Sequence, residues 1–449
     1  MSDDWSPGSW RRKPLLQPIE YPDGEKLEAA VRRLSRFPPL VTSWEIETLK
    51  SRLAEAAQGE RFLLQGGDCA ETFEDCCSSI IANKLKILLK MSLVLTFGGK
   101  TRIIRVGRMA GQYAKPRSRL EETRGGVVLP AYRGAMINRP EFSREARTPD
   151  PDLMIHAYLH AALTLNFVRS LVHGGFADLR HPEFWDLRFV DFSSRSHEYR
   201  RMLKEIGEAV SFLEAVAERP LAELGRAEFF TSHEGLNLWY EQAQTRRVPR
   251  RSGWYDLSTH FPWIGDRTRE IRAAHVEFFR GIANPVAVKA GTSCEPDELL
   301  ELTRVLNPDN VPGKLTVIHR FGADRIERHL PPLIEILKRH ERRVVWSCDP
   351  MHGNTISLGN GLKTRRFDDI LREVVQAFSI HKALGGRLNG VHFELSGEDV
   401  TECIGGARGT TEADLCRAYQ SQVDPRLNYE QAMEMALLLS RCMRDKTPT

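Results

Sequence analysis

From residue 61 onward the sequence repeats one pattern, in which a short β-rich apolar run is followed by a polar loop and, in several cases, by a helical stretch. There are eight such runs: Arg61–Gln65, Thr101–Val106, Ala227–Thr231, His260–Trp263, Pro285–Val288, Leu315–Ile318, Val344–Ser347 and Gly390–Phe393. Apolar runs that alternate with helices are typical of a parallel sheet covered by helices, which predicts an α/β protein. Eight runs favour a closed (β/α)8 TIM barrel over an open doubly wound sheet.

Ionisable or metal-binding side chains stand at or just beyond the end of most of these runs. They are Cys69, Arg108, Glu234, Lys289, Arg320, His352 and Glu394. A barrel built only for stability has no physical need to gather such groups at one rim. An active site on the C-terminal face of a barrel requires them. The pattern therefore predicts an enzyme.

The seventh run illustrates both this prediction and its alternative. The run Val344–Ser347 stops at Asp349-Pro350, where proline bars the backbone from continuing a central strand, and His352 follows at once. Taken alone, the stretch also fits a strand–turn–helix junction with incidental polar residues. The ends of the other runs favour an active site.

Composition narrows the class of protein. With 41% hydrophobic and 28% charged residues among 449, the chain fits a soluble globular protein. A formal net charge of +4 is small for this length and argues against a nucleic-acid-binding protein. The N-terminus lacks a signal-peptide pattern, and the apolar stretch 87–97 is too short for a membrane span. Eight scattered cysteines without a CxxC pair are typical of cytosolic free thiols, so we expect a cytoplasmic protein.

Residues 1–60 are predicted to form an N-terminal helical extension, and residues 61–449 the catalytic barrel. One helix carries Leu27, Val31 and Leu34 on one face, ahead of Pro38-Pro39. A second helix begins at the capping-box pattern Thr42-Ser43-Trp44-Glu45. We expect the extension to cap the domain or to form an oligomer contact.

A long helical insertion, about residues 140–222, separates the second and third runs. Its first helix is expected to begin after Pro149-Asp150-Pro151 and to end near Gly174-Gly175. Its second helix carries Leu203, Ile206, Val210 and Leu213 on one face. The insertion is far longer than a barrel crossover needs. Two interpretations stay open: packing filler, or an effector-binding or oligomer-forming element.

Two sets of side chains carry the predicted chemistry. The first is a candidate metal site formed by Cys69, His352, Glu394 and Asp424. A thiolate, an imidazole and two carboxylates suit Mn²⁺, Co²⁺, Fe²⁺ or Zn²⁺ and fit Mg²⁺ or Ca²⁺ poorly. The spacings are long, and a buried cysteine or histidine without a metal is individually the commoner finding.

The second set is cationic and comprises Arg108, Lys115, Arg117, Arg267, Lys289 and Arg320. Arginine forks suit carboxylate and phosphate, so these residues predict a polyanionic, phosphorylated small substrate. The alternative is a solvated surface with ordinary ion pairs, which fits poorly because Lys289 and Arg320 directly follow apolar runs. A metal Lewis acid beside such a clamp indicates carbonyl chemistry on molecules like sugar phosphates.

Several longer blocks of sequence resemble one family. They are Gly66–Glu71, Gly111–Ser118, Val317–Arg320, Cys348–Asn354 and Gly390–Glu394. In order, and over nearly the whole chain, they are similar to class II 3-deoxy-D-arabino-heptulosonate 7-phosphate (DAHP) synthase. The resemblance implies a (β/α)8 barrel that uses one divalent metal ion, commonly Mn²⁺ or Co²⁺. The implied reaction condenses phosphoenolpyruvate with erythrose 4-phosphate, releases phosphate and begins the shikimate pathway.

The resemblance also assigns roles to residues. It implies Cys69, His352, Glu394 and Asp424 as metal ligands, with Asp424 resting on the local Val423–Asn428 match. It places phosphoenolpyruvate on Arg108, Asp266, Arg267, Lys289 and Arg320. It places the aldehyde substrate on the block Lys115–Ser118, with Arg117 and Ser118 on its phosphate. Lys115, Arg117, Lys289 and His352 become the catalytic candidates, and Asp349 takes a structural or supporting role. The general acid or base stays open among Lys115, Glu234 and His352.

One position departs from the family pattern. Asp266 stands in Trp263–Arg267 where the family often has glutamate. A side-chain contact with ligand would fall short by about one methylene, whereas a backbone N–H contact would be nearly unaffected. We favour the backbone contact, because an anionic side chain gains little beside a phosphate.

The resemblance further implies feedback inhibition by an aromatic amino acid (Trp, Phe or Tyr) and a homo-oligomer, either dimer or tetramer. We expect the effector site around the insertion helices, so deleting about residues 171–205 should abolish inhibition and spare some turnover. Two rival interpretations remain at this point. One is another metal-dependent barrel synthase that uses a different aldehyde, and the other is a non-catalytic ligand sensor.

Overall fold

The computed structural model describes residues 5–174, 188–193, 196–217 and 228–444. Its centre is an eight-stranded parallel sheet in the order β5-β2-β1-β14-β11-β10-β9-β8. The strands are β1 (Arg61–Gly67), β2 (Arg102–Arg108), β5 (Phe230–Thr231), β8 (Trp263–Ile264), β9 (Val286–Ala290), β10 (Leu315–His319), β11 (Val345–Cys348) and β14 (Gly390–Glu394). Consecutive barrel strands therefore pair with each other, except that β5 and β8 form the two ends of the sheet, and the last strand, β14, pairs with the first, β1.

Backbone hydrogen bonds close the sheet between its two end strands. Phe261 N donates to Thr231 O at 3.2 Å, and Trp263 N donates to His233 O at 3.1 Å. Gly235 N returns a bond of 3.0 Å to Trp263 O. The predicted (β/α)8 barrel is confirmed. The third and fourth strands are shorter than the sequence predicts, and Ala227, where the third was expected to begin, lies outside the described residues.

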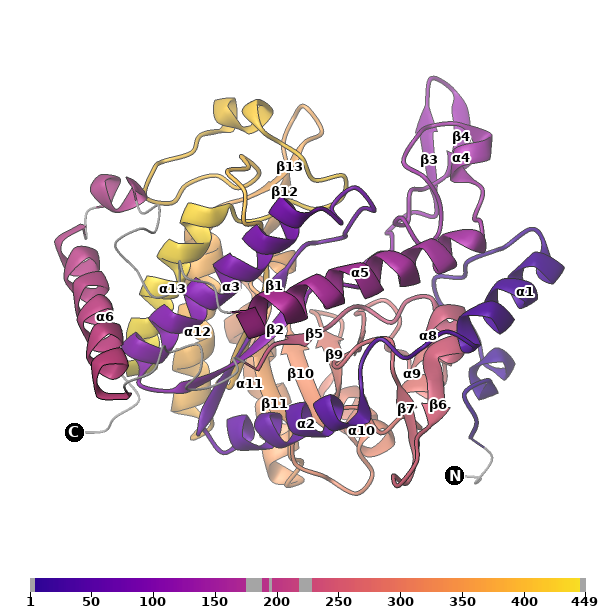
Figure 1. Cartoon of the computed structure of the whole chain (residues 1–449), viewed down its shortest axis with the longest axis horizontal. Helices are drawn as coiled ribbons and strands as arrows, with labels where there is room; N and C mark the ends of the chain where they lie inside the picture. The colour runs from indigo at the N-terminus through magenta and orange to yellow at the C-terminus, as the bar shows by residue number, and fades with distance from the viewer. Residues whose placement is uncertain (1–4, 175–187, 194–195, 218–227, 445–449) are drawn as a thin grey trace.

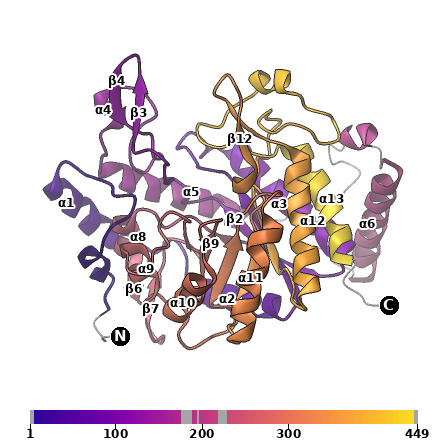
Figure 2. The same ribbon diagram turned by 180° about the vertical axis from the view of Figure 1, so that it is seen from behind.

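Helices surround the barrel (Figures 1 and 2). They are α3 (Ser78–Gly99), α8 (Leu238–Gln244), α9 (Ala274–Phe279), α10 (Pro296–Leu306), α11 (Ile326–Arg339), α12 (Phe367–Ala383) and α13 (Tyr429–Arg444). Alternate strand residues face these helices: Leu315 and Val317 of β10 join the cluster between sheet and helices, whereas Ile318 joins the cluster inside the barrel. Because direction alternates along a strand, Arg320 follows Ile318 to the inside. Lys289 follows Ala287 inward in the same way.

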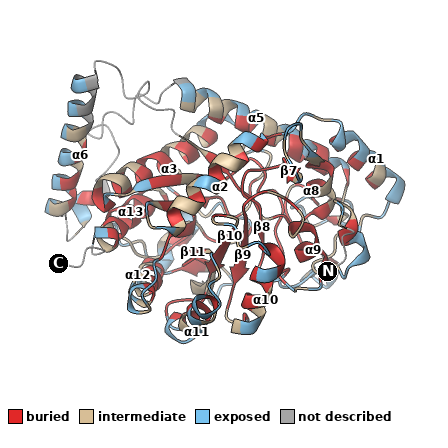
Figure 3. Cartoon of the chain, turned by 90° about the horizontal axis from the view of Figure 1, so that it is seen from below, coloured by how far each residue is buried: buried red, intermediate tan, exposed pale blue. Residues whose placement is uncertain are grey.

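The N-terminal extension contains both predicted helices, α1 (Gly24–Ser35) and α2 (Ser43–Ala57). The capping box of α2 is present, since Glu45 N donates to Thr42 Oγ1 and Thr42 N donates to Glu45 Oε2 at 2.8 Å. Leu49 and Leu53 of α2 pack with interior barrel residues such as Leu63. Ala56 O of α2 accepts from Asn389 Nδ2, directly before β14, at 2.8 Å, so α2 lies at the N-terminal end of the strands (Figure 3).

The insertion between β2 and β5 contains α4 (Arg144–Arg147), α5 (Asp152–Gly174), the 3-10 helix Arg188–Phe192 and α6 (Ser196–Ala217). Both predicted helices are present as α5 and α6. Residues 175–187, 194–195 and 218–227 of the insertion lie outside the described part. Within the described ranges, no helix has the length and apolar composition that a membrane crossing would need.

Three short antiparallel hairpins were not predicted. They are β3 (Glu121–Arg124) with β4 (Val127–Pro130), β6 (Thr245–Arg247) with β7 (Trp254–Asp256), and β12 (Thr355–Ser357) with β13 (Lys363–Arg365). The first projects from the body of the molecule (Figure 1). Its turn residues Gly125 and Gly126 have φ of 55° and 81°. Two adjacent glycines are the usual sequence signal for such a turn, and that signal was available.

Candidate active site

The C-terminal ends of the barrel strands open into a cavity of about 1190 Å³. Every site residue predicted from the sequence lines it: Cys69, Arg108, Lys115, Arg117, Ser118, Asp266, Arg267, Lys289, Arg320, His352, Glu394 and Asp424. The barrel brings these residues together because each lies on, or just past, the same end of a strand or on a loop above that end. Gln112, Glu234, Trp263, Lys363 and Gln422 line the cavity as well.

The candidate metal ligands form a compact cluster at the base of the cavity. The ligand atoms of Cys69, Glu394 and Asp424 all lie within 4.8 Å of one another. His352 Nε2 lies 3.0 Å from Glu394 Oε1. Burial and the neighbouring carboxylates raise the pKa of the Cys69 thiol to about 12, so a thiolate there needs a cation.

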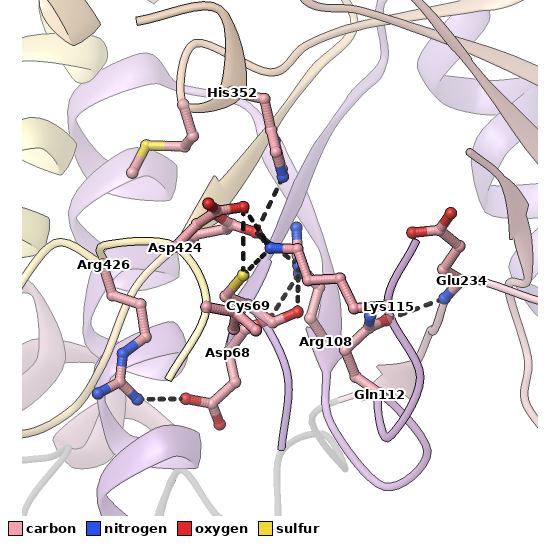
Figure 4. A network of polar contacts seen from close by, with 12 residues as sticks. Asp68, Cys69, Arg108, Gln112, Lys115, Glu234, His352, Asp424 and Arg426 are labelled. Carbon is pink, nitrogen blue, oxygen red and sulfur yellow. Dashed lines mark hydrogen bonds and ion pairs between the residues drawn. The ribbon is translucent and has the colours of Figure 1, made fainter. Parts of the chain in front are cut away.

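The side chain of Lys115 lies inside this cluster (Figure 4). Its ammonium contacts Cys69 Sγ and an Asp424 carboxylate oxygen, and it lies 3.9 Å from Glu394 Oε1. The cluster therefore stabilises a positive charge. A soft sulfur donor beside two carboxylates and an imidazole fits Mn²⁺, Co²⁺, Fe²⁺ or Zn²⁺.

His352 is oriented by the aspartate that ends the seventh strand. Asp349 Oδ2 lies 2.7 Å from His352 Nδ1, and Asp349 Oδ1 accepts from His352 N at 3.2 Å. The carboxylate thus binds one ring nitrogen and turns the other toward Glu394, an arrangement typical of metal-binding histidines. Asp349 also pairs with Lys289 and is fully buried.

The opposite wall of the cavity is cationic and is built from strand ends. Lys289 belongs to β9, and Arg320 N extends the ladder beyond β10 by donating to Ala290 O at 3.0 Å. Burial lowers the pKa of Lys289 to about 8, although the nearby carboxylate of Asp349 acts in the other direction. The ring of Trp263 lies 5.2 Å from the Arg108 guanidinium carbon and 5.9 Å from Lys289 Nζ.

Arg108 is clamped in the layer beneath this wall. Its Nε donates to Asp68 O at 3.0 Å, and its Nη2 donates to Cys69 O at 3.2 Å and to Glu394 Oε1 at 3.0 Å. Its Nη1 contacts His392 Nε2. Of its five N–H groups, this arrangement leaves one on Nη1 for a ligand.

A chain of hydrogen bonds runs through the barrel interior from Arg108 to the carbonyl of Gly107. Because that carbonyl can only accept, it fixes which group donates at each step. Ser232 Oγ donates to Gly107 O at 3.2 Å, so it accepts from Gln65 Nε2 at 2.9 Å. Gln65 Oε1 then accepts from His392 Nδ1 at 2.8 Å. Nε2 of a neutral His392 therefore carries the lone pair that accepts from Arg108. Gln65, Ser232 and His392 were not predicted as site residues; their alternation with Gly67, Glu234 and Glu394 was the available signal.

A separate loop forms the remaining side of the cavity. The fully buried Glu71 carboxylate accepts from the backbone N–H groups of Ala110, Gly111 and Gln112 at 3.1, 3.0 and 2.9 Å and fixes the start of the loop. Farther along, Arg117 Nη2 lies 3.5 Å from Glu122 Oε1. Ser118 Oγ accepts from Arg267 Nη2 at 3.4 Å and joins the loop to the cationic wall.

Two carboxylates in the cavity have distinct environments. Glu234 Oε1 is buried without a hydrogen-bond partner among the described residues, and burial raises the pKa of Glu234. The Asp266 carboxylate instead accepts from Gly291 N at 2.8 Å and lies 3.3 Å from Arg269 Nε. The side chain of Asp266 is thus bound within the protein, and Glu234 has the freer oxygen.

Comparison with known proteins gives one consistent result. The sequence matches the Class-II DAHP synthetase family over residues 5–440. It is 46% identical over 438 residues to a phospho-2-dehydro-3-deoxyheptonate aldolase of Streptomyces coelicolor, covering 98% of this chain and 97% of the relative. A Neurospora crassa protein of the same name is 45% identical over 452 residues, covering 97% of this chain and 94% of that one.

A solved structure adds a likeness of fold. The phospho-2-dehydro-3-deoxyheptonate aldolase of Francisella tularensis SCHU S4 superposes with a TM-score of 0.51 and covers 94% of this chain and 97% of its own. The sequences are 14% identical, so this likeness concerns the fold alone.

Proposed function

The chain belongs to the Class-II DAHP synthetase family and is a DAHP synthase, and on that premise we propose how its residues act on phosphoenolpyruvate and D-erythrose 4-phosphate. The products are DAHP and inorganic phosphate, in the first step toward chorismate and the aromatic amino acids. One observation carries this proposal: a single cavity joins a metal-binding cluster, a cationic wall and a second cationic loop, as two phosphorylated substrates require.

Phosphoenolpyruvate binds against the cationic wall in this proposal. Lys289, Arg320 and Arg267 neutralise its carboxylate and phosphate, and Arg108 offers its remaining N–H. Arg117 and Ser118 bind the phosphate of the aldehyde substrate, and Lys115 stands between the two substrates. Holding both reactants in a fixed geometry supplies much of the acceleration.

The metal fits the cluster described above. Cys69, His352, Glu394 and Asp424 would hold one divalent ion, Mn²⁺ or Co²⁺ in first place and Fe²⁺ or Zn²⁺ otherwise, which supplies Lewis acidity toward the aldehyde oxygen. Carbon 3 of phosphoenolpyruvate attacks the aldehyde carbon, and the aldehyde oxygen takes a proton. Water adds at carbon 2 and loses one proton, which gives a tetrahedral intermediate that carries a hydroxyl and the phosphate. The hydroxyl then loses its proton to the departing phosphate as the C=O bond forms and the bond between carbon 2 and the phosphate oxygen breaks. Among Lys115, Glu234 and His352, the unpartnered oxygen favours Glu234 as the proton carrier.

A phosphate-release assay tests the proposal. Chelation should abolish release, stepwise addition of metal should restore it, and Cys69→Ser should prevent the restoration. Full activity after chelation would refute the metal requirement. A profile of four- and five-carbon sugar phosphates separates this enzyme from a synthase that uses another aldehyde. Binding of phosphoenolpyruvate without any phosphate release would favour a ligand sensor.

We also propose a cytoplasmic homo-oligomer, dimer or tetramer, inhibited by an aromatic amino acid. All eight cysteines are free thiols, which supports a reducing compartment. Leu159 and Leu163 on α5, and Phe212 and Val216 on α6, are exposed apolar side chains that an oligomer would cover. The proposed effector site lies around α5 and α6, in part outside the described residues. Deleting residues 171–205 should abolish inhibition and spare some turnover.

A further inference from the structure

Gln17 of the N-terminal extension contacts the loop that lines one side of the active-site cavity. We infer that Gln17 is a positioning residue for the aldehyde substrate, because its side chain holds the backbone of the loop that carries Arg117. This inference rests on the proposed function and deepens it. It gives the extension a role in substrate binding besides covering the opposite end of the barrel.

The contacts form a clamp on both sides of the loop. Gln17 Oε1 accepts from Arg117 N at 2.9 Å. The guanidinium of Arg133 donates to Gln17 O at 2.8 Å and to Pro18 O. Arg133 O in turn accepts from Lys115 N at 2.9 Å. Two successive N–H groups of the Lys115-Pro116-Arg117 segment are therefore bound, one by Gln17 directly and one by the arginine that binds Gln17.

Backbone geometry and burial support a functional contact. Gln17 has a φ of 57°, in the left-handed region that residues other than glycine seldom adopt. Such a conformation persists only where the surroundings fix it, and it is common at binding sites. Arg133 is buried, and burial lowers its pKa to about 10, so it stays charged at neutral pH. Its bonds to the two carbonyls are charge-assisted and stronger than neutral ones.

The clamp acts on only one of the two substrates. Lys289 and Arg320, on the cationic wall, are held by the barrel ladder, and within the described part of the chain they form no hydrogen bond or ion pair with residues 5–23. Arg117 and Ser118 lie on a loop whose backbone depends on Gln17. Loss of the Gln17 acceptor leaves the Arg117 N–H unpaired and frees the phosphate-binding end of the loop. The effect should therefore fall on erythrose 4-phosphate.

Steady-state kinetics of the full-length, metal-loaded enzyme test this inference. Gln17→Ala should raise the KM for erythrose 4-phosphate roughly five- to tenfold, as expected for one lost hydrogen bond. The KM for phosphoenolpyruvate should stay within about twofold, since Gln17 itself bonds to the loop and the loop meets the wall through the long Ser118–Arg267 contact of 3.4 Å. Gln17→Glu keeps an acceptor oxygen and should restore the KM. Gln17→Gly relieves the backbone strain but lacks the acceptor, so it should match Gln17→Ala. Glu20→Ala, an exposed change on the same segment, is the matched control.

Each outcome is decisive. Equal rises in both KM values would indicate a merely structural role and overturn the inference. An unchanged KM for erythrose 4-phosphate in Gln17→Ala would overturn it as well. A wild-type enzyme that releases no phosphate with erythrose 4-phosphate would overturn the proposed function first and this inference with it. If the wild type is active and Gln17→Ala has an unchanged KM for erythrose 4-phosphate, the inference is overturned and the proposed function stands.

Discussion

The two sides of the cavity position their cations in different ways. On the proposed phosphoenolpyruvate side, Lys289 and Arg320 extend from strands whose backbone is bound in the barrel ladder. On the aldehyde side, Arg117 and Ser118 lie on a loop bound by Gln17, Arg133 and Glu122, none of which is on a barrel strand. The barrel itself thus fixes one proposed substrate site, and the additions to the barrel fix the other.

This difference indicates how one fold can keep the binding site for one substrate constant and vary the binding site for the other. A strand-borne charge cannot move without disturbing the ladder, whereas a loop-borne charge can be repositioned by changing the elements that support it. The candidate metal cluster lies between the two sides, since it includes Glu394 of β14 and is contacted by Lys115 of the loop. Variants on each side should therefore separate the two substrates, and variants in the cluster should not.

The largest effect is expected where the two sides meet. Cys69→Ser should reduce kcat at least about thousandfold, because a Lewis acid contributes several kcal/mol to such a reaction. Phosphoenolpyruvate should still bind, since the cationic wall is intact, and calorimetry can measure its Kd. Loss of phosphoenolpyruvate binding in this variant would contradict the separation of wall and cluster.

Lys289→Met should give the next largest effect, confined to one substrate. It removes a buried cation and leaves Asp349 without that partner, so kcat/KM for phosphoenolpyruvate should fall roughly 10²- to 10³-fold. The KM for erythrose 4-phosphate should change little. Lys314→Met is a matched control, because Lys314 binds the carbonyls of Ile282 and Asn284 at the other end of the barrel. It should lower Tm and leave both KM values unaltered.

His392→Phe tests the interior network beneath the wall. The phenyl ring keeps most of the volume but cannot accept from Arg108 or donate to Gln65. One N–H of a buried guanidinium is then unpaired, and the KM for phosphoenolpyruvate should rise roughly 10-fold or more. A similar rise for erythrose 4-phosphate would show that the network supports the whole cavity rather than one side.

The sequence predicted the strand-borne half of the site well, because the alternation of side chains along a strand is a local rule. Lys289, Arg320 and Glu394 could be placed on the rim from the apolar runs before them. The same rule puts His392 inside the barrel two residues before Glu394. His392 was nevertheless predicted only as part of a strand, and its contact with Arg108 was missed. The four candidate metal ligands were proposed from their residue types, but their long spacings form no local motif, so the family resemblance was the stronger argument for them.

The loop-borne half could not be derived in this way. Gln17 and Arg117 are 100 positions apart, and no periodicity links a glutamine in the extension to an N–H in a distant loop. The β3–β4 hairpin was missed because its strands are short and mostly exposed, although Gly125-Gly126 marked its turn. Long-range contacts between irregular segments leave no repeated pattern in the sequence.

The smallest effect should come from Glu122→Gln, at the outer edge of the aldehyde side. Glu122 accepts from the buried Arg147 at 3.1 Å, and it lies 3.5 Å from Arg117 Nη2 in a pair whose two side chains are both partly exposed. Partly exposed ion pairs contribute little and are screened by salt, so the KM for erythrose 4-phosphate should change only about two- to threefold. The change should shrink further as ionic strength rises, which kinetics at low and high salt can check. A salt-independent effect as large as that of Gln17→Ala would mean that charge at the hairpin, rather than the backbone clamp, positions Arg117.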